Sequence, residues 1–256
     1  MLFITHYRIV IALLIREMAS RFGNKPGGYL WALLEPAGYV LLMTSVFRVV
    51  THTPALGDSF PYFYASGYMG FFFYNGTLSY VGGALSGNKA LLNYPTVAPI
   101  DTVVARFILQ MLTCVFVALA TFYIIIEFEM QRPPNINWWP ILEAATLGGF
   151  LALGVGMSNT VLFLKFPVYQ SVYGIMTRPL LLISGVFFIP EGMPMPYRDI
   201  LTINPVVHVI TLFRTGLFPE YRATSLDLSY LYAIVALALF SGSALFFVSS
   251  KTLRNG

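Results

Sequence analysis

The sequence predicts an all-α polytopic membrane protein made of one domain, residues 1–256. Of its 256 residues, 57% are hydrophobic and only 10% are charged. The apolar residues form blocks that match the roughly 20 residues a helix needs to cross the hydrocarbon core of a bilayer. Six blocks are long enough, which predicts six transmembrane helices. Their predicted ranges are 28–49, 61–85, 103–126, 140–164, 168–189 and 228–250.

Residues 3–25 precede the first span and predict an amphipathic helix. Apolar side chains recur along this segment at helical spacing, from Phe3 to Phe22. Arg8 and Arg16 bracket only seven apolar residues, which are too few for a further span. A helix of this kind lies in the interface between lipid and water.

The charges predict that both termini are cytoplasmic. An even number of spans puts the two termini on one side, and Lys and Arg accumulate on the cytoplasmic side of spanning helices. With the termini inside, ten of the 15 Lys and Arg residues lie at or near the cytoplasmic face, and five lie toward the outside.

Glu35 and Arg178 are charged residues inside predicted spans. A charge at the bilayer centre costs roughly 2.5 to 3.5 kcal/mol on insertion scales, so such residues usually face a partner or a cavity. Glu35 can bond to neighbouring helices, pair with Arg178, or line a substrate entrance. These alternatives stay open, and both residues are candidates for a substrate path.

Residues 199–219 predict a re-entrant pair of half-helices before the last span. The segment is apolar but too short to cross, and Pro205 breaks it. Irregular backbone at membrane depth is tolerated only where protein or water surrounds it. Asn204, Pro205 and His208 lie at the break, where His208 can satisfy freed backbone carbonyls. A surface amphipathic helix is the alternative, and His208 has no second ligand nearby, so we expect no metal site.

Residues 86–99 predict a short helix between the second and third spans. Ser86 can cap its N-terminus and Pro95 can stop it. Such a helix can carry force from a soluble partner, whereas the alternative is an ordinary loop packed on its own bundle.

The stretch 82–89 is not a phosphate-binding loop. The nucleotide-binding motif needs Gly-Lys-Ser/Thr, but Lys89 is flanked by Asn88 and Ala90. We therefore expect this chain to bind no ATP or other cofactor and to contain no catalytic residue.

Three segments resemble the membrane subunit of ABC-2-type exporters, and closely the permease of Gram-negative capsule-polysaccharide exporters. The first comprises residues 16–23 and the run Tyr-Leu-Trp-Ala-Leu-Leu-Glu-Pro at 29–36. The second is 88–95, and the third comprises 184–188 and 204–208. The resemblance covers essentially the whole chain, and the run at 29–36 is its most specific part.

The resemblance implies a homodimer in the bacterial inner membrane, assembled with two copies of a cytoplasmic ATP-binding subunit that holds ATP and Mg. Together they are expected to move lipid-linked capsular polysaccharide from cytoplasm to periplasm. A periplasmic polysaccharide co-polymerase and an outer-membrane channel are the other implied partners, and no nucleic acid is expected.

Under this resemblance, residues 86–99 become a cytoplasmic coupling helix that binds the ATPase. Arg16 and Arg21 can supply further contacts to the same subunit, or can bind anionic lipid headgroups. The candidate residues for ATPase coupling are Asn88, Lys89, Leu91, Leu92, Asn93, Tyr94, Arg16 and Arg21.

An aromatic stripe in the second span is a candidate for the substrate path. Tyr64, Tyr68, Phe71 and Asn75 share one helix face. Aromatic rings can stack on sugar C–H faces, while hydroxyls and amides can bond to sugar hydroxyls. Helix–helix packing is the alternative for the same residues.

Two other functions stay open. An exporter of O-antigen or teichoic acid would have the same fold. A membrane-embedded glycosyl or acyl transferase needs clustered Asp, Glu or His at one interface. Only Glu35 and His208 are candidates for such a cluster, and they are predicted to lie on opposite sides.

Overall fold

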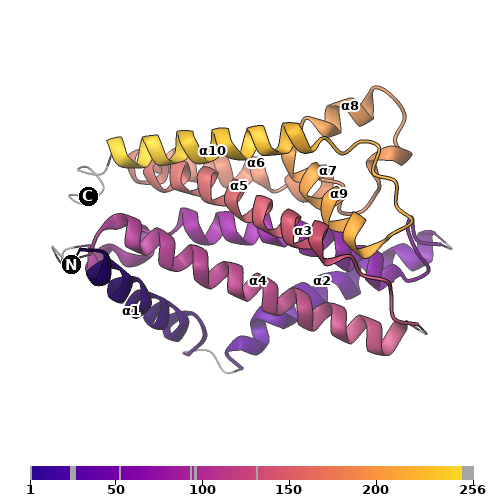
Figure 1. The fold of residues 1–256 in the computed structure, drawn as a ribbon, viewed down its shortest axis with the longest axis horizontal. Helices are drawn as coiled ribbons and strands as arrows, with labels where there is room; N and C mark the ends of the chain where they lie inside the picture. Colours follow the sequence, from indigo (N-terminus) through magenta and orange to yellow (C-terminus); the bar gives the residue numbers. More distant parts are fainter. Residues whose placement is uncertain are drawn as a thin grey trace.

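The computed structural model describes residues 2–23, 27–51, 53–92, 94, 97–130 and 132–249, and that part of the chain contains helices but no strand. This confirms the all-α prediction. The elements in chain order (Figure 1) are α1 Leu2–Phe22, α2 Tyr29–Val50, α3 Phe60–Gly82, η1 Ser86–Leu91, α4 Pro99–Glu129, α5 Trp138–Lys165, α6 Pro167–Thr177, α7 Leu180–Ile183, η2 Pro190–Gly192, α8 Tyr197–Thr202, α9 Pro205–Leu217 and α10 Leu228–Val248.

Within the described residues, four helices are both long and apolar enough to cross a membrane: α2, α4, α5 and α10. They correspond to four of the six predicted spans. Figure 1 shows the start of α1 and the end of α10 at the same end of the molecule. The number of six spans and the side on which the termini lie stay predictions.

The aromatic helix α3 forms the centre of the bundle. It packs against α2, α4, α5 and α9, and most of its side chains are buried. The Ser59 side chain caps its start by accepting a hydrogen bond from the Tyr62 backbone N–H, and Pro61 suits the first turn, where helical N–H groups lack partners. Because other helices pack around α3, most of its side chains, including Tyr62, Tyr64 and Tyr74, face protein.

The helices α5 and α10 approach each other closely at two glycines. A Cβ atom on Gly242 would lie 2.1 Å from the carbonyl oxygen of Gly154, and one on Gly154 would lie 2.4 Å from the carbonyl carbon of Ala238. Small residues at such a crossing let two membrane helices pack backbone against backbone.

We expect Gly242→Ala to lower the melting temperature of the purified protein, since overpacking typically costs about 1 to 3 kcal/mol. Gly38→Ala on α2 is the matched control, because a Cβ atom there meets no atom within 4 Å. Both changes bring the same gain in helix propensity. Equal melting temperatures for the two variants would contradict the close approach.

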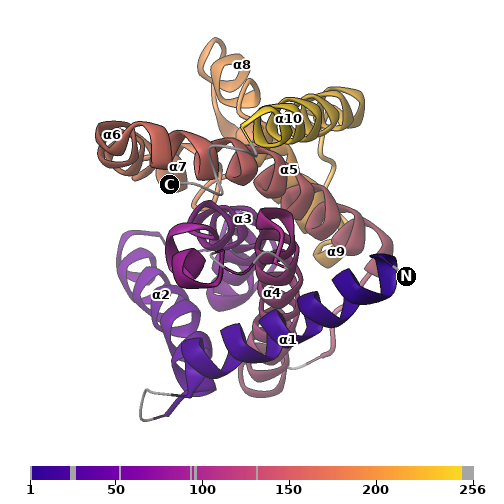
Figure 2. The same cartoon turned by 90° about the vertical axis from the view of Figure 1, so that its left-hand side faces the viewer.

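The helix α1 lies across one end of the bundle and packs along α4, as Figure 2 shows. It covers most of the predicted interface helix 3–25, although residues 24–26 lie outside the described part of the chain. Its orientation across the bundle is the one expected of a helix in the membrane interface.

The predicted fifth span, 168–189, differs from the single helix we expected. The chain forms α6 and α7, separated at Arg178 and Pro179, and α7 ends at Ile183. Pro179 has no N–H to donate to the preceding turn. The chain then turns at Gly185, whose φ of +79° suits glycine.

The predicted half-helices at 199–219 correspond to α8 and α9, which are separated at Ile203 and Asn204. The Asn204 side chain caps α9 by accepting a hydrogen bond of 3.0 Å from the Val206 N–H. Most of α9 is buried against α3 and α5. Its depth in the membrane stays a prediction.

Candidate functional site

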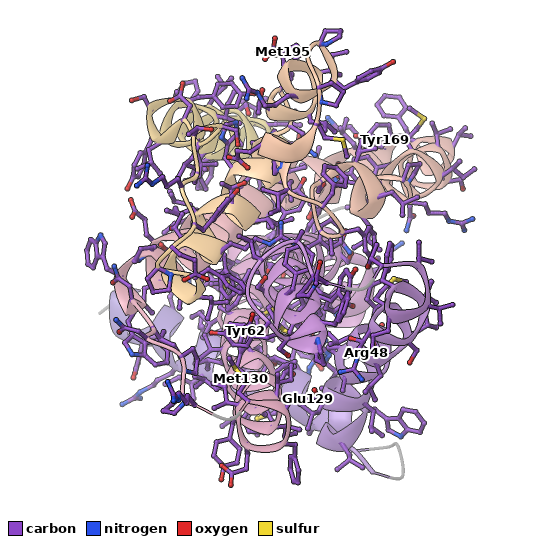
Figure 3. All side chains as sticks on the ribbon, turned by 90° about the vertical axis from the view of Figure 1, so that its right-hand side faces the viewer. Arg48, Tyr62, Glu129, Met130, Tyr169 and Met195 are labelled. Atoms are coloured by element: carbon purple, nitrogen blue, oxygen red, sulfur yellow. The ribbon has the colours of Figure 1, made fainter. Side chains whose placement is uncertain are left out.

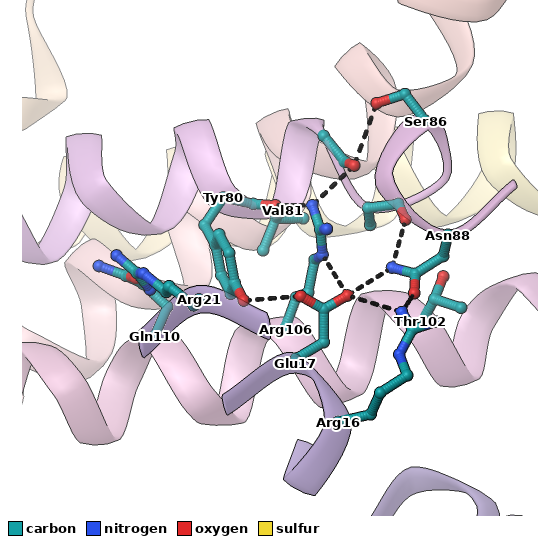
Figure 4. Close-up of polar contacts among 12 residues, drawn as sticks. Arg16, Glu17, Arg21, Tyr80, Val81, Ser86, Asn88, Thr102, Arg106 and Gln110 are labelled. Atoms are coloured by element: carbon teal, nitrogen blue, oxygen red, sulfur yellow. Dashed lines mark hydrogen bonds and ion pairs between the residues drawn. The ribbon is translucent and has the colours of Figure 1, made fainter. Parts of the chain in front are cut away.

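The carboxylate of Glu17 on α1 is the centre of a polar cluster. Glu17 is only 4% exposed. It accepts hydrogen bonds from the Tyr80 hydroxyl at 2.8 Å, from Asn88 Nδ2 at 2.7 Å and from Arg106 Nε at 3.1 Å. Figure 4 shows these bonds converging on one carboxylate from α3, η1 and α4. The Glu17 side chain thus joins α1 to three other elements.

The bonds continue into the turn between α3 and η1. Asn88 Nδ2 also donates to the carbonyl of Ala84 at 2.9 Å, and the Arg16 guanidinium donates to Asn88 Oδ1. Arg106 Nη1 donates to the carbonyl of Gly83 at 2.7 Å. The turn is therefore held by side chains of both α1 and α4.

Two arginines enclose the ring of Tyr80. The guanidinium carbons of Arg21 and Arg106 lie 4.4 and 4.8 Å from the ring centroid, within the range of a cation–π interaction. Arg21 Nη1 also donates to Gln110 Oε1 at 2.5 Å. We call the whole set the Glu17 cluster: Arg16, Glu17, Arg21, Tyr80, Asn88, Arg106 and Gln110.

The cluster keeps Glu17 ionised. Burial alone raises the pKa of its carboxyl, but the hydrogen bond from Asn88 and the positive charge of Arg106 outweigh burial and hold the pKa below its usual value. The ionised carboxylate is therefore present at neutral pH as an acceptor for all of its donors.

The predicted coupling helix has a different form from the one expected. Ser86–Leu91 is a 3₁₀ helix, and Asn88 departs from helical geometry with φ −120° and ψ 15°. Asn88 is 2% exposed because its side chain points into the Glu17 cluster. The hydrogen bonds of its side chain are therefore made within the chain, and a part in ATPase coupling stays a prediction.

The remaining coupling residues divide into buried and exposed ones. Leu92 is buried in an apolar cluster that α3, α4, α5 and α10 also form, and Leu91 is half-buried. Lys89 is exposed and Tyr94 is 61% exposed, so these two can meet a partner. Asn93 lies outside the described residues. Binding of an ATPase by this segment stays a prediction.

The residues of the aromatic stripe in α3 also differ in exposure. Tyr64 and Phe71 are 4% and 5% exposed, whereas Tyr68 and Asn75 are half-buried. The Tyr68 ring stacks on Tyr39 of α2, with ring centroids 4.5 Å apart. Within a single copy, Tyr64 and Phe71 pack in the core, and Tyr68 and Asn75 are the members still accessible to a substrate.

Glu35 and Arg178 are both exposed in a single copy. The structure does not bring them together as an ion pair; ion pairs among the described residues include Arg16–Glu17, Arg48–Glu129 and Arg106–Glu17. A charged group at membrane depth requires a partner or water. For both residues, that partner can be a second copy of the chain, and the water can be that of an aqueous path.

His208 bonds a freed backbone carbonyl, as the sequence predicted. Its Nδ1 accepts a hydrogen bond from the Asp227 N–H at 3.1 Å, so its proton is on Nε2, which donates to the Thr202 carbonyl at 2.8 Å. That carbonyl is free because the Asn204 side chain takes the Val206 N–H. No group of three or more His, Cys, Asp or Glu residues suited to a metal ion occurs among the described residues.

Sequence reasoning missed the role of Arg214, which is 0% exposed. Its Nη1 donates to the carbonyls of Gly185 at 2.7 Å and Phe188 at 2.9 Å, and its Nη2 donates to that of Val186 at 2.7 Å. The guanidinium also lies 4.5 Å from the ring centroid of Phe63. The signal was an arginine directly after the apolar stretch 200–213; it is one of the five basic residues that the charge count places toward the outside.

The opposite end of the molecule carries a polar pocket of about 810 Å³. Figure 3 looks at this end, where Arg48 and Glu129 link α2 to α4 at 3.1 Å. Tyr62, Glu129, Arg132 and Glu220 are among the residues that line the pocket. The two ends thus differ: one holds the buried Glu17 cluster and the other an open pocket.

Comparison with known proteins gives one consistent family. The model of the ABC-2 type transporter family matches residues 8–218. The polysialic acid transport protein KpsM of Escherichia coli is 34% identical over 93% of this chain and 92% of its own length.

Two further relatives are capsule polysaccharide export inner-membrane proteins. CtrC of Neisseria meningitidis serogroup B is 25% identical over 82% of this chain and 79% of its own length. BexB of Haemophilus influenzae is 24% identical over 88% of this chain and 84% of its own length.

Proposed function

The chain belongs to the ABC-2 type transporter family, and we propose that it is the membrane subunit of an ATP-driven exporter of lipid-linked capsular polysaccharide. The observation that carries this proposal is the match along 93% of the chain to a polysialic acid transport protein. The other relatives named above are inner-membrane proteins of capsule export. The polymer moves from cytoplasm to periplasm, and the subunit resides in the inner membrane.

ATP and Mg bind to a separate cytoplasmic subunit, of which the complex has two copies. In support, the only lysine of the near-motif at 82–89, Lys89, lacks the flanking residues that phosphate binding needs. A periplasmic co-polymerase and an outer-membrane channel complete the proposed export route.

Two copies of the chain form the pathway. The exposed apolar side chains of α2 and α6 support this arrangement, as do the exposed charges of Glu35 and Arg178. Pairing through these faces covers apolar surface and offers the two charges a polar lumen. The ends of α1 and α10 face the cytoplasm.

Depletion of this chain in the cell that produces it tests the function. Surface capsule should fall while lipid-linked polysaccharide accumulates in the cytoplasm, because synthesis continues without export. Accumulation of O-antigen or teichoic acid instead would assign the chain to that branch of the family. Loss of the polymer without intracellular accumulation would indicate a transferase.

The ATP-binding subunit is proposed to dock on the exposed side of η1. We expect Lys89→Glu combined with Tyr94→Ala to reduce its co-purification strongly, since both side chains are exposed there. The matched control is Tyr197→Ala in α8, whose side chain is 63% exposed at the other end of the molecule. If the double variant co-purifies with the ATP-binding subunit as well as the unmodified chain does, the docking surface is not at η1.

A further inference from the structure

The Glu17 carboxylate connects segments that are far apart in the chain. Its donors are 63, 71 and 89 residues away, at Tyr80, Asn88 and Arg106. The ion pair with Arg106 is well shielded, with side-chain exposures of 5% for Glu17 and 12% for Arg106. Charge-assisted hydrogen bonds in such surroundings are stronger than neutral ones.

Asn88 is the point where η1 enters this network. Its amide bridges two elements, because Nδ2 donates both to Glu17 of α1 and to the Ala84 carbonyl of its own turn. The next residue of the same short segment, Lys89, is exposed. A displacement of the exposed side of η1 therefore reaches α1 through the side chain of Asn88, which donates to Glu17 and accepts from Arg16.

Close packing prevents η1 from sliding over α4. A Cβ atom on Gly87 would lie 2.2 Å from Arg106 Nη2, so the guanidinium rests directly against the backbone of the turn. At the other end of α1, His6 Nδ1 lies 3.1 Å from Asp101 Oδ1 at the start of α4. Together with the Glu17–Arg106 bond, the His6–Asp101 contact holds α1 against α4 at two places.

We propose that Glu17 is a positioning residue that fastens the interface helix α1 to the α3–η1 turn, so that both follow the ATP-binding subunit as one unit. This inference rests on the proposed function. Glu17 is not itself a docking residue, because its carboxylate is buried and already accepts from three other elements. Its effect is to couple the docking surface to α3 and α4.

An exchange of hydrogen-bond roles tests the proposal. Glu17→Gln removes the charge that Arg106 faces, and Asn88→Asp places a second carboxylate against Glu17. Each change should lower polysaccharide export about tenfold or more, because buried charged groups lose their partners. The double variant Glu17→Gln/Asn88→Asp restores one amide facing one carboxylate, and its export should exceed that of either single variant several-fold.

Coupling is separated from folding by measurements on the purified complex. In Glu17→Gln the ATP-binding subunit should still co-purify and hydrolyse ATP, while export per ATP falls. Glu127→Gln, at an exposed position near the other end of α4, is the control and should export normally. Wild-type export in both single variants, or a double variant no better than the worse single one, overturns the proposal.

A distance measurement gives an answer that does not depend on these variants. Spin labels at the exposed residues Ser20 on α1 and Ser86 on η1 should keep the same separation in nucleotide-free and vanadate-trapped complexes. A shift of several ångströms between the two states overturns the single-unit proposal. Absence of ATP-driven export by the unmodified complex would instead refute the proposed function itself.

Discussion

Arg214→Met is expected to reduce strongly both the yield and the melting temperature of the purified protein. Arg214 is fully buried and supplies the donors for the carbonyls of Gly185, Val186 and Phe188. Methionine has similar length but no N–H group, and each buried acceptor left without a donor costs about 1 to 3 kcal/mol. The total is a large fraction of the 5 to 15 kcal/mol that typically stabilises a folded protein.

The matched control is Arg222→Met, which removes an exposed arginine only a few residues further along the chain. Its melting temperature should stay close to that of the unmodified protein, since surface substitutions usually change stability by less than about 0.5 kcal/mol. If Arg214→Met and Arg222→Met unfold at the same temperature, the carbonyls at 185–188 do not depend on Arg214.

Phe71→Ala and Tyr68→Ala are both expected to lower export, but to differ in how much stability they lose. Phe71 is 5% exposed in the core, and replacing a buried aromatic side chain with alanine typically costs about 3 to 5 kcal/mol. Phe71→Ala should therefore lower stability and export together. Tyr68 is half-buried and stacks on Tyr39, so Tyr68→Ala should lower export with a smaller loss of stability.

The deciding data are surface polysaccharide per cell and the melting temperature of the purified complex, measured for both variants. Leu78→Ala provides a reference for pure packing loss on the same helix, because Leu78 is 3% exposed. If Tyr68→Ala loses export only in proportion to its loss of melting temperature, as Phe71→Ala and Leu78→Ala are expected to do, then Tyr68 is a packing residue. Normal export together with normal stability would remove it from the substrate path.

Local sequence signals predicted the elements that depend on local chemistry. Pro205 predicted the break that separates α8 from α9, and His208 was expected to bond a freed carbonyl there. The long apolar blocks predicted the helices α2, α4, α5 and α10. These features could be read from sequence because a missing N–H or an apolar run acts within a few residues.

The Glu17 cluster could not be predicted in the same way. Glu17 and Asn88 are 71 residues apart, and only the packing of α1 across α4 brings them together. For the same reason the sequence made Asn88 a candidate for ATPase coupling, although its side chain is buried in the structure. The count of charges on the two sides placed Arg214 toward the outside, and it could not show that the turn at 185–188 offers this side chain three carbonyls.

Export by purified components tests the central claim most directly. The chain and its ATP-binding subunit are reconstituted in proteoliposomes with the ATP-binding subunit outside, and lipid-linked capsular polysaccharide is supplied in the outer leaflet. The proposed function predicts that ATP and Mg together make the polymer resistant to an external glycosidase, and that omitting ATP or the ATP-binding subunit leaves it fully digestible. Polymer that stays digestible with every component present, or that becomes protected without ATP, contradicts the assignment of this chain as an ATP-driven polysaccharide exporter.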